Sequence, residues 1–112
     1  MQTQTEFYDV IREWEEHCMR PEVVLSSIGG KVCDCDAYKK IVEMGKADLP
    51  MIRQLYDEKT IDFASQMIKS HGLVKAVQEI VRDEFQIPTE IQGKLREMEQ
   101  YTARWLNYYL IR

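Results

Sequence analysis

The chain has 112 residues, of which 45% are hydrophobic and 30% are charged, and this balance is typical of a globular domain rather than a disordered or fibrous chain. The length fits one domain, residues 1–112, and allows a core to form without disulfides or metals. Nineteen acidic against fifteen basic side chains give a net charge of −4, which lacks the positive field that attracts phosphate backbones, so nucleic acid is a disfavoured partner.

The sequence shows no membrane-spanning or secretory signal. No apolar run approaches the roughly 20 residues that a spanning helix needs, and residues 1–5 have neither a basic n-region nor an apolar h-region. The three cysteines are an odd number, and Cys33 and Cys35 are too close in sequence for an unstrained disulfide. We therefore expect a cytoplasmic protein with reduced thiols and no membrane contact.

A first helix is predicted at about residues 5–17. Hydrophobic residues recur there at the intervals of three and four that mark one face of a helix: Phe7, Val10, Ile11, Trp14 and Cys18. The helix is expected to end before Pro21, because the proline ring excludes Arg20 from helical geometry. Residues 21–34 are predicted to form a connector with a short turn packed on the core, since the segment contains Ser26, Ser27, Gly29 and Gly30.

Residues 35–52 are predicted to form a helical hairpin. Its first helix begins at a cap supplied by Asp34 or Asp36 and ends at Gly45, a residue that adopts left-handed backbone conformations at low cost. The next helix follows at once and holds Pro50 in its first turn, where a missing N–H costs nothing.

Three further helices are predicted in the remaining chain. One is capped by Thr60 and ends at a break at His71 and Gly72, although the pattern over residues 60–70 is compatible with a helix or a loop. Another begins at Leu73 and ends near Phe85, before Ile87-Pro88. The last covers about residues 94–110 and has an apolar arc around half its circumference.

The predicted fold is all-α, a compact orthogonal or bundle-like array of five or six short helices. No stretch shows the alternation of a β-strand bounded by hairpin turns. The apolar arc of the last helix is wide, and a helix of this kind can take one of two positions in the fold. It is either the central helix of the fold, or an outer helix whose surplus aromatic surface meets another chain.

Three sequence features form a recognisable set: Leu25-Ser26-Ser27, then Ala37-Tyr38 with Ile41-Val42 and Met44-Gly45, then Trp105-Leu106 after Ile87-Pro88. Together they resemble a family of small uncharacterised helical proteins of bacteria and archaea. The chain departs from that pattern where residues 60–70 stand as an insertion and Leu73-Val74 replace tryptophans. The resemblance implies a helical fold and its boundaries, and it implies no activity or site residue. Separately, the turn from Met44 to Pro50 is similar to the turn of a HEAT-type repeat, although no second copy is present.

Five histidine and cysteine residues raise the alternative of a metal-binding protein or an enzyme: His17, Cys18, Cys33, Cys35 and His71. Their spacing does not favour it, because one residue separates Cys33 from Cys35 and the other donors are dispersed. Cys35 lies between two aspartates, which raise a thiol pKa and make it a poor nucleophile. His71 is interpreted as a cation at a helix C-terminus, and no cofactor is expected.

The favoured function is a small non-catalytic protein-interaction module, such as an adaptor, an inhibitor or an antitoxin-like protein, or a homo-oligomerising helical protein. Its partner is another protein or a second copy of the chain, as in a homodimer. Tyrosines give a large contact area with few rotatable bonds to freeze, and they are enriched where proteins meet. The predicted partner-binding residues are Tyr8, Tyr101, Tyr108 and Tyr109.

Overall fold

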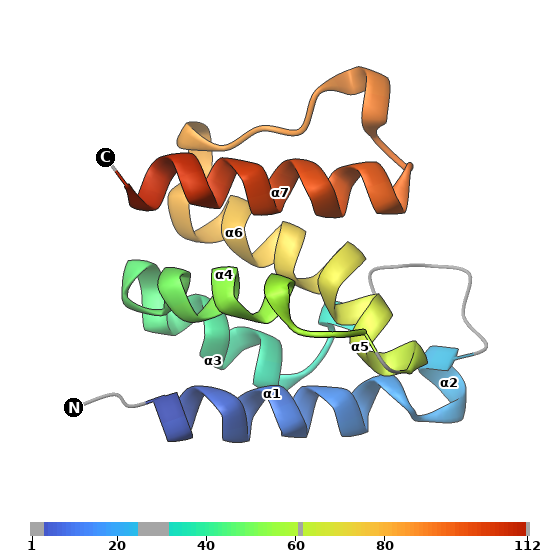
Figure 1. Ribbon diagram of the computed structural model, residues 1–112. Coiled ribbons are helices and arrows are strands. Elements are labelled where there is room, and N and C mark those ends of the chain that lie inside the picture. Colours follow the sequence, from blue (N-terminus) through green and yellow to red (C-terminus); the bar gives the residue numbers. More distant parts are fainter. Residues whose placement is uncertain (1–3, 25–31, 61, 112) are drawn as a thin grey trace.

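The computed structural model describes residues 4–24, 32–60 and 62–111. Its α-helices are α1 (Gln4–Cys18), α2 (Pro21–Val24), α3 (Asp36–Met44), α4 (Leu49–Asp57), α5 (Phe63–Met67), α6 (Leu73–Val81) and α7 (Leu95–Leu110) (Figure 1). Between them lie the 3₁₀ turns η2 (Gly45–Asp48), η4 (Arg82–Glu84) and η5 (Thr89–Ile91) and the π-helical turn η3 (Ile68–Gly72).

The predicted all-α fold is confirmed. The described residues contain no β-strand, and five of the helices have nine residues or more. The radius of gyration is 13.2 Å, close to the value expected for a compact chain of this length. Across the same residues, no helix combines the length and the apolar character that crossing a bilayer requires.

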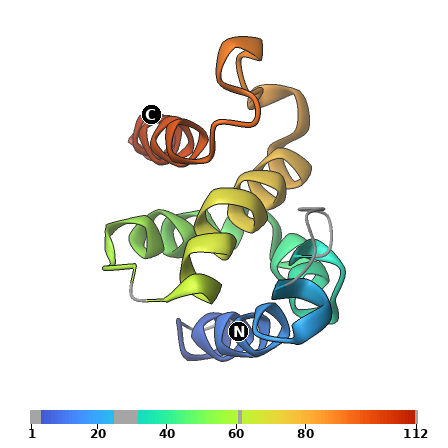
Figure 2. The same ribbon diagram turned by 90° about the vertical axis from the view of Figure 1, so that its right-hand side faces the viewer.

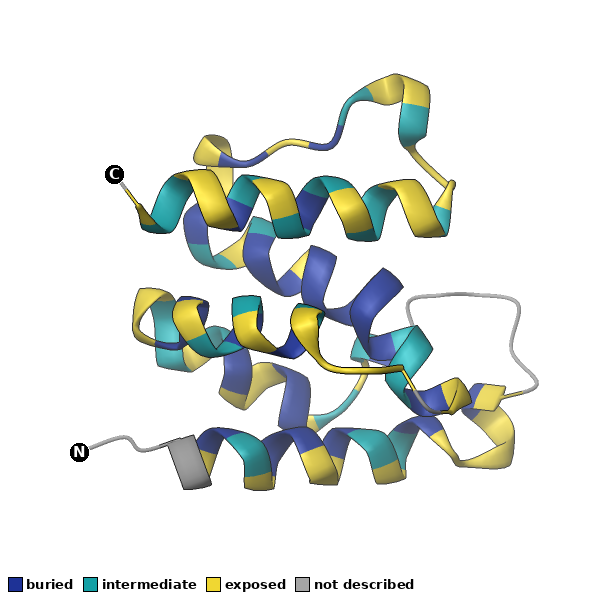
Figure 3. Cartoon of the chain, in the orientation of Figure 1, coloured by how far each residue is buried: buried dark blue, intermediate teal, exposed yellow. Residues whose placement is uncertain are grey.

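Helix α6 occupies the centre of the molecule, and α1 and α7 lie on opposite sides of it (Figures 1 and 2). Most of α6 is buried (Figure 3), including Leu73, Val74, Ala76, Val77 and Val81. By contrast, Thr102 and Leu106 are the fully buried residues of α7. A helix that is hydrophobic around most of its surface belongs in a core, so α6 is the central helix and α7 is an outer one.

The helical hairpin is confirmed in its turn and corrected at its start. Gly45 has φ +66° and ψ −150°, a conformation that non-glycine residues rarely adopt, and Pro50 lies in the first turn of α4. The N-cap of α3 is Cys35, without a side-chain cap hydrogen bond. The predicted cap at Asp34 or Asp36 is therefore wrong. Asp36 is the first helical residue, where its charge favours the helix N-terminus.

The segment 63–81 is one continuous helical rod, and the predicted break at His71 and Gly72 is wrong. Gly72 has helical angles, φ −66° and ψ −53°. A Cβ atom at this position would lie 2.3 Å from Cζ2 of Trp14, so the glycine is needed for close packing between α1 and the rod. The rod begins after Asp62, whose side chain accepts a hydrogen bond from the Ser65 amide at 2.8 Å. Thr60 is therefore not its cap.

Trp14 fixes the position of α1 on this rod. Its side chain is fully buried, and its indole N–H donates a hydrogen bond of 2.7 Å to the Val32 carbonyl. Its ring meets the Tyr38 ring edge-on at 5.7 Å. Trp14 thus joins α1 to α3, to the rod and to the chain ahead of α3. Leu25, Ser26 and Ser27, which carried part of the family resemblance, lie outside the described residues, as does the rest of 25–31.

Candidate functional site

Four aromatic rings form a row along α7 and the segment ahead of it. The Phe85 ring lies 5.8 Å from the Tyr101 ring and 4.8 Å from the Trp105 ring, and Trp105 stacks on Tyr109 at 4.8 Å. Tyr101, Trp105 and Tyr109 are spaced by four residues, which places them side by side on the helix. We call Phe85, Tyr101, Trp105 and Tyr109 the aromatic ladder.

The α3–α4 turn holds one end of the ladder. The Lys46 ammonium lies 3.3 Å from a Glu84 carboxylate oxygen and 6.0 Å from the centroid of the Tyr109 ring, within the range of a cation–π contact. Interaction with Tyr109, and secondly with Glu84, raises the pKa of Lys46. Turn η2 is thereby linked both to η4 and to α7.

Two large hydrophobic residues stay exposed where α7 ends. Tyr108 keeps 65% of its surface accessible and Ile111 keeps 83%. Tyr108 follows Trp105 by three residues and Tyr101 by seven, so these residues share one side of the helix. We call Tyr101, Trp105, Tyr108 and Ile111 the α7 edge. It is an apolar strip that shares Tyr101 and Trp105 with the aromatic ladder.

Three of the four predicted partner-binding tyrosines lie on α7, and the fourth does not. Tyr8 lies on α1, on the opposite side of the molecule from α7 (Figures 1 and 2). Its hydroxyl donates a hydrogen bond of 3.1 Å to Glu58. Partial burial and this carboxylate raise the pKa of Tyr8. Tyr8 therefore has a local role beside α4 and is not part of the α7 edge.

Sequence reasoning missed Phe85 and Lys46 as parts of this site. Phe85 was interpreted only as a helix end, yet it is 1% exposed and lies against two α7 rings. It reaches them because the chain from 82 to 94 returns along α7 (Figure 1). No local pattern encodes that return, although a phenylalanine isolated after a predicted helix end was a weak signal of tertiary packing.

The five metal-ligand candidates do not form one metal site among the described residues. Cys33 and His71 line a pocket of about 440 Å³ beside α6 and the start of α7. His17 and Cys35 line a separate pocket of about 310 Å³, and Cys18 is buried on α1. Among the residues that the structure describes, no group of three or more His, Cys, Asp or Glu side chains could hold a metal ion.

Burial suppresses the reactivity of the thiols. It raises the pKa of Cys18 and of Cys33 to about 12, and that of Cys35 to about 11. The thiolate is the nucleophilic and metal-binding form of cysteine, so little of it is present at neutral pH. His71 lies inside the π-helical turn, and burial lowers its pKa. Its predicted role as a cation at a helix end is therefore wrong.

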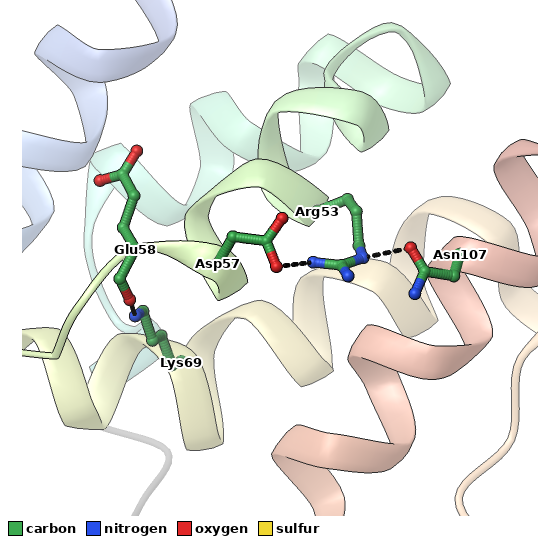
Figure 4. A network of polar contacts seen from close by, with 5 residues as sticks. All are labelled: Arg53, Asp57, Glu58, Lys69 and Asn107. Atoms are coloured by element: carbon green, nitrogen blue, oxygen red, sulfur yellow. Dashed lines mark hydrogen bonds and ion pairs between the residues drawn. The ribbon is translucent and has the colours of Figure 1, made fainter.

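A hydrogen bond joins α7 to α4 (Figure 4). The Arg53 guanidinium donates to the Asn107 side-chain oxygen at 2.6 Å and to Asp57 at 2.8 Å. Nearby, the buried Lys69 ammonium donates to the Glu58 carbonyl and to the Thr60 hydroxyl, and the Lys69 carbonyl accepts from Tyr56 at 2.8 Å. The Arg53–Asn107 hydrogen bond therefore supplements the apolar packing between α4 and α7, whereas the Lys69 contacts join the end of α4 to turn η3.

Asn107→Ala should weaken the attachment of α7. The substitution removes the acceptor of Arg53, and loss of one hydrogen bond to a charged, half-buried group costs about 1 kcal/mol. Chemical denaturation of the purified protein measures the loss. Gln100→Ala, an exposed position on the same helix, is the matched control, and equal losses in the two variants would contradict the role given to Asn107.

Comparison of the chain with protein-family models, with curated proteins and with solved structures found no match. The geometry described above, rather than a relative, is therefore the basis for a functional proposal. The family resemblance and the HEAT-like turn stay predictions from the sequence.

Proposed function

We propose that the chain is a small non-catalytic protein-interaction module that associates with a second copy of itself through the α7 edge. One observation carries this proposal: Tyr108 and Ile111 are 65% and 83% exposed beside an ordered aromatic row. Exposed tyrosines next to rigid apolar surface are characteristic of interaction sites. We further propose a cytoplasmic location, which the three free cysteines support.

The charges around the α7 edge favour a second copy as the partner. Arg104 and Lys46 supply positive charge there, and Glu84 supplies negative charge. In a two-fold dimer the same surface meets itself, so a surface with one sign of charge would repel its copy. A surface with both signs allows opposite charges to meet across the symmetry axis.

Tyr108→Ser is expected to weaken self-association. Truncating a hot-spot tyrosine at the centre of an interface costs more than about 1 kcal/mol of binding free energy, and a loss of about 1.4 kcal/mol raises the dissociation constant tenfold. Sedimentation velocity over a range of protein concentrations measures that constant. Met19→Ser is the matched control, because Met19 is 55% exposed and follows α1, on the opposite side of the molecule from α7.

Two results would count against the proposal. The first is a wild-type protein that stays monomeric at every concentration while the Tyr108 ring resonances do not change with concentration. The second is a Met19→Ser variant that dissociates as readily as Tyr108→Ser. The expected pattern is dimer loss confined to substitutions in the α7 edge.

A further inference from the structure

Asp48 is a buried acidic residue at the junction of turn η2 and helix α4. It is the last residue of turn η2 and the N-cap of α4, and its side chain has no accessible surface. An N-cap aspartate usually accepts a hydrogen bond from an amide of the first helical turn. Here the cap bond is not formed, and neither carboxylate oxygen has a hydrogen-bond partner among the described residues.

Burial determines when this carboxyl group carries a charge. It raises the pKa of Asp48 from 3.8 to about 7. Turn η2 packs against α3, α4 and α6. Charged groups of these helices are engaged elsewhere: Lys40 with Glu13, Arg53 with Asp57 and Glu79 with Tyr38.

The other charged residues on those helices and on the turn do not compensate for the buried carboxyl group. Asp36, Lys39, Glu43, Lys75 and Lys46 lie on these elements, and none of them forms a hydrogen bond with either Asp48 carboxylate oxygen. Within the described part of the chain, an ionised Asp48 therefore has no cation as a hydrogen-bond partner. A buried carboxylate in this state must gain water or a donor, and the nearest way to reach water is movement of the turn that carries it.

The same turn carries the contact to the aromatic ladder. Lys46 is two residues before Asp48, and its ammonium bridges Glu84 and the Tyr109 ring. Tyr109 stacks on Trp105, which belongs to the α7 edge. Displacement of η2 would therefore withdraw the cation from Tyr109 and loosen the packing of Tyr109 on Trp105, a residue of the α7 edge.

We propose that turn η2 is a pH-responsive latch on the α7 edge, closed when the Asp48 carboxyl group is protonated and open when it is ionised. The latch rests on the proposed function, since the surface that it regulates is the proposed self-association surface. The closed turn holds Lys46 over Tyr109 and keeps the α7 edge competent to bind a second copy. The open turn exposes Asp48 and weakens that association.

NMR titration of the full chain tests the latch directly. Between pH 5 and 9, the Asp48 side-chain carbon should titrate near pH 7, and the Lys46 amide and Tyr109 ring resonances should follow with the same midpoint. In Asp48→Asn the Lys46 and Tyr109 changes should vanish. In Lys46→Met, an exposed substitution that leaves the core intact, Asp48 should still titrate while the Tyr109 ring no longer follows it.

Sedimentation velocity supplies the functional readout. The wild-type association constant should fall on the order of tenfold from pH 6 to pH 8.5, a typical coupling between two sites, and Asp48→Asn should keep the low-pH value throughout. The variants His17→Gln and His71→Gln should retain the wild-type change, because the latch does not depend on the histidines.

The outcomes separate the two proposals. Self-association that is independent of pH overturns the latch and leaves the proposed function standing. A protein that stays monomeric, but whose Lys46 and Tyr109 resonances follow Asp48, supports the latch and overturns the proposed function. An Asp48 midpoint below pH 5, or Tyr109 changes that persist in Asp48→Asn, overturns the latch.

Discussion

Gly72→Ala is expected to destabilise the protein by about 2–3 kcal/mol, a loss typical of an overpacked core. On an exposed helix the same substitution would stabilise by about 1 kcal/mol, because alanine is the better helix former. At position 72 the substitution is destabilising instead, because the added Cβ would lie 2.3 Å and 2.6 Å from two ring carbons of Trp14. The indole cannot move away freely, since it is fully buried and bonded to the Val32 carbonyl.

Urea denaturation measures the loss, and a double-mutant cycle tests its cause. Trp14→Phe removes the two ring carbons that the new methyl group would meet. Gly72→Ala should therefore cost less in the Trp14→Phe background than in the wild type, with a favourable coupling energy. A Gly72→Ala protein as stable as the wild type would contradict this explanation, and so would additive effects in the cycle. Either result would show that the Trp14 ring is not the reason why glycine is needed at position 72.

Asp48→Asn is expected to remove a pH dependence of stability. The pKa of Asp48 is about 7 in the folded chain against an ordinary 3.8, so the folded state binds its proton more tightly than the unfolded state. The stabilisation by this proton is fully present below about pH 4 and is lost as the pH rises through 7. At 1.36 kcal/mol for each pKa unit, the largest possible change is about 4 kcal/mol.

At pH 8 the asparagine variant should be more stable than the wild type by about 2 kcal/mol. The gain falls short of the limit because the buried amide N–H groups also need partners. The difference between the two proteins in free energy of unfolding, measured from pH 4 to pH 8, isolates Asp48 from the other titrating groups. A difference that does not change with pH would contradict the assignment.

Asp62 provides the matched control, because its pKa is shifted in the opposite direction to that of Asp48. Like Asp48 it is a helix N-cap, but it is exposed and accepts the Ser65 amide hydrogen bond. That contact lowers the pKa of Asp62. Its contribution to stability is therefore present above its unfolded pKa and is lost as the pH falls, so Asp62→Asn should destabilise the protein at pH 8 rather than stabilise it.

The sequence predicted those parts of the fold that local signals specify. Gly45 and Pro50 marked the end of one helix and the start of the next, because each residue restricts the backbone wherever it occurs. The apolar arc of residues 94–110 likewise predicted α7, and its aromatic residues include three members of the ladder. These features depend on residues within a few positions of one another.

The features that the sequence did not predict depend on tertiary packing. From its residue type, Gly72 is expected to end a helix. In the structure it lies inside a helix, where the absence of a side chain makes room for the Trp14 ring, and the sequence alone does not show that contact. The burial of Asp48 and the contact of Phe85 with α7 depend on residues far apart in the chain. For the same reason Tyr8 could not be separated from the α7 tyrosines by its residue type.

The π-helical turn η3 lets the two halves of one helical rod direct their hydrophobic residues toward different neighbouring helices. Buried residues follow the rod at intervals of four, then five, then four and four: Ala64, Ile68, Leu73, Val77 and Val81. The extra residue offsets the phase of the apolar stripe by about 100°, one residue's rotation in an α-helix. Helix α5 thereby faces α1 and α6 faces α3, while turn η3 between them lies against both α1 and α7. Deleting a single residue within this turn would rotate the hydrophobic face of one half of the rod away from the helices that it packs against. The number of residues in the turn is therefore as constrained as their type.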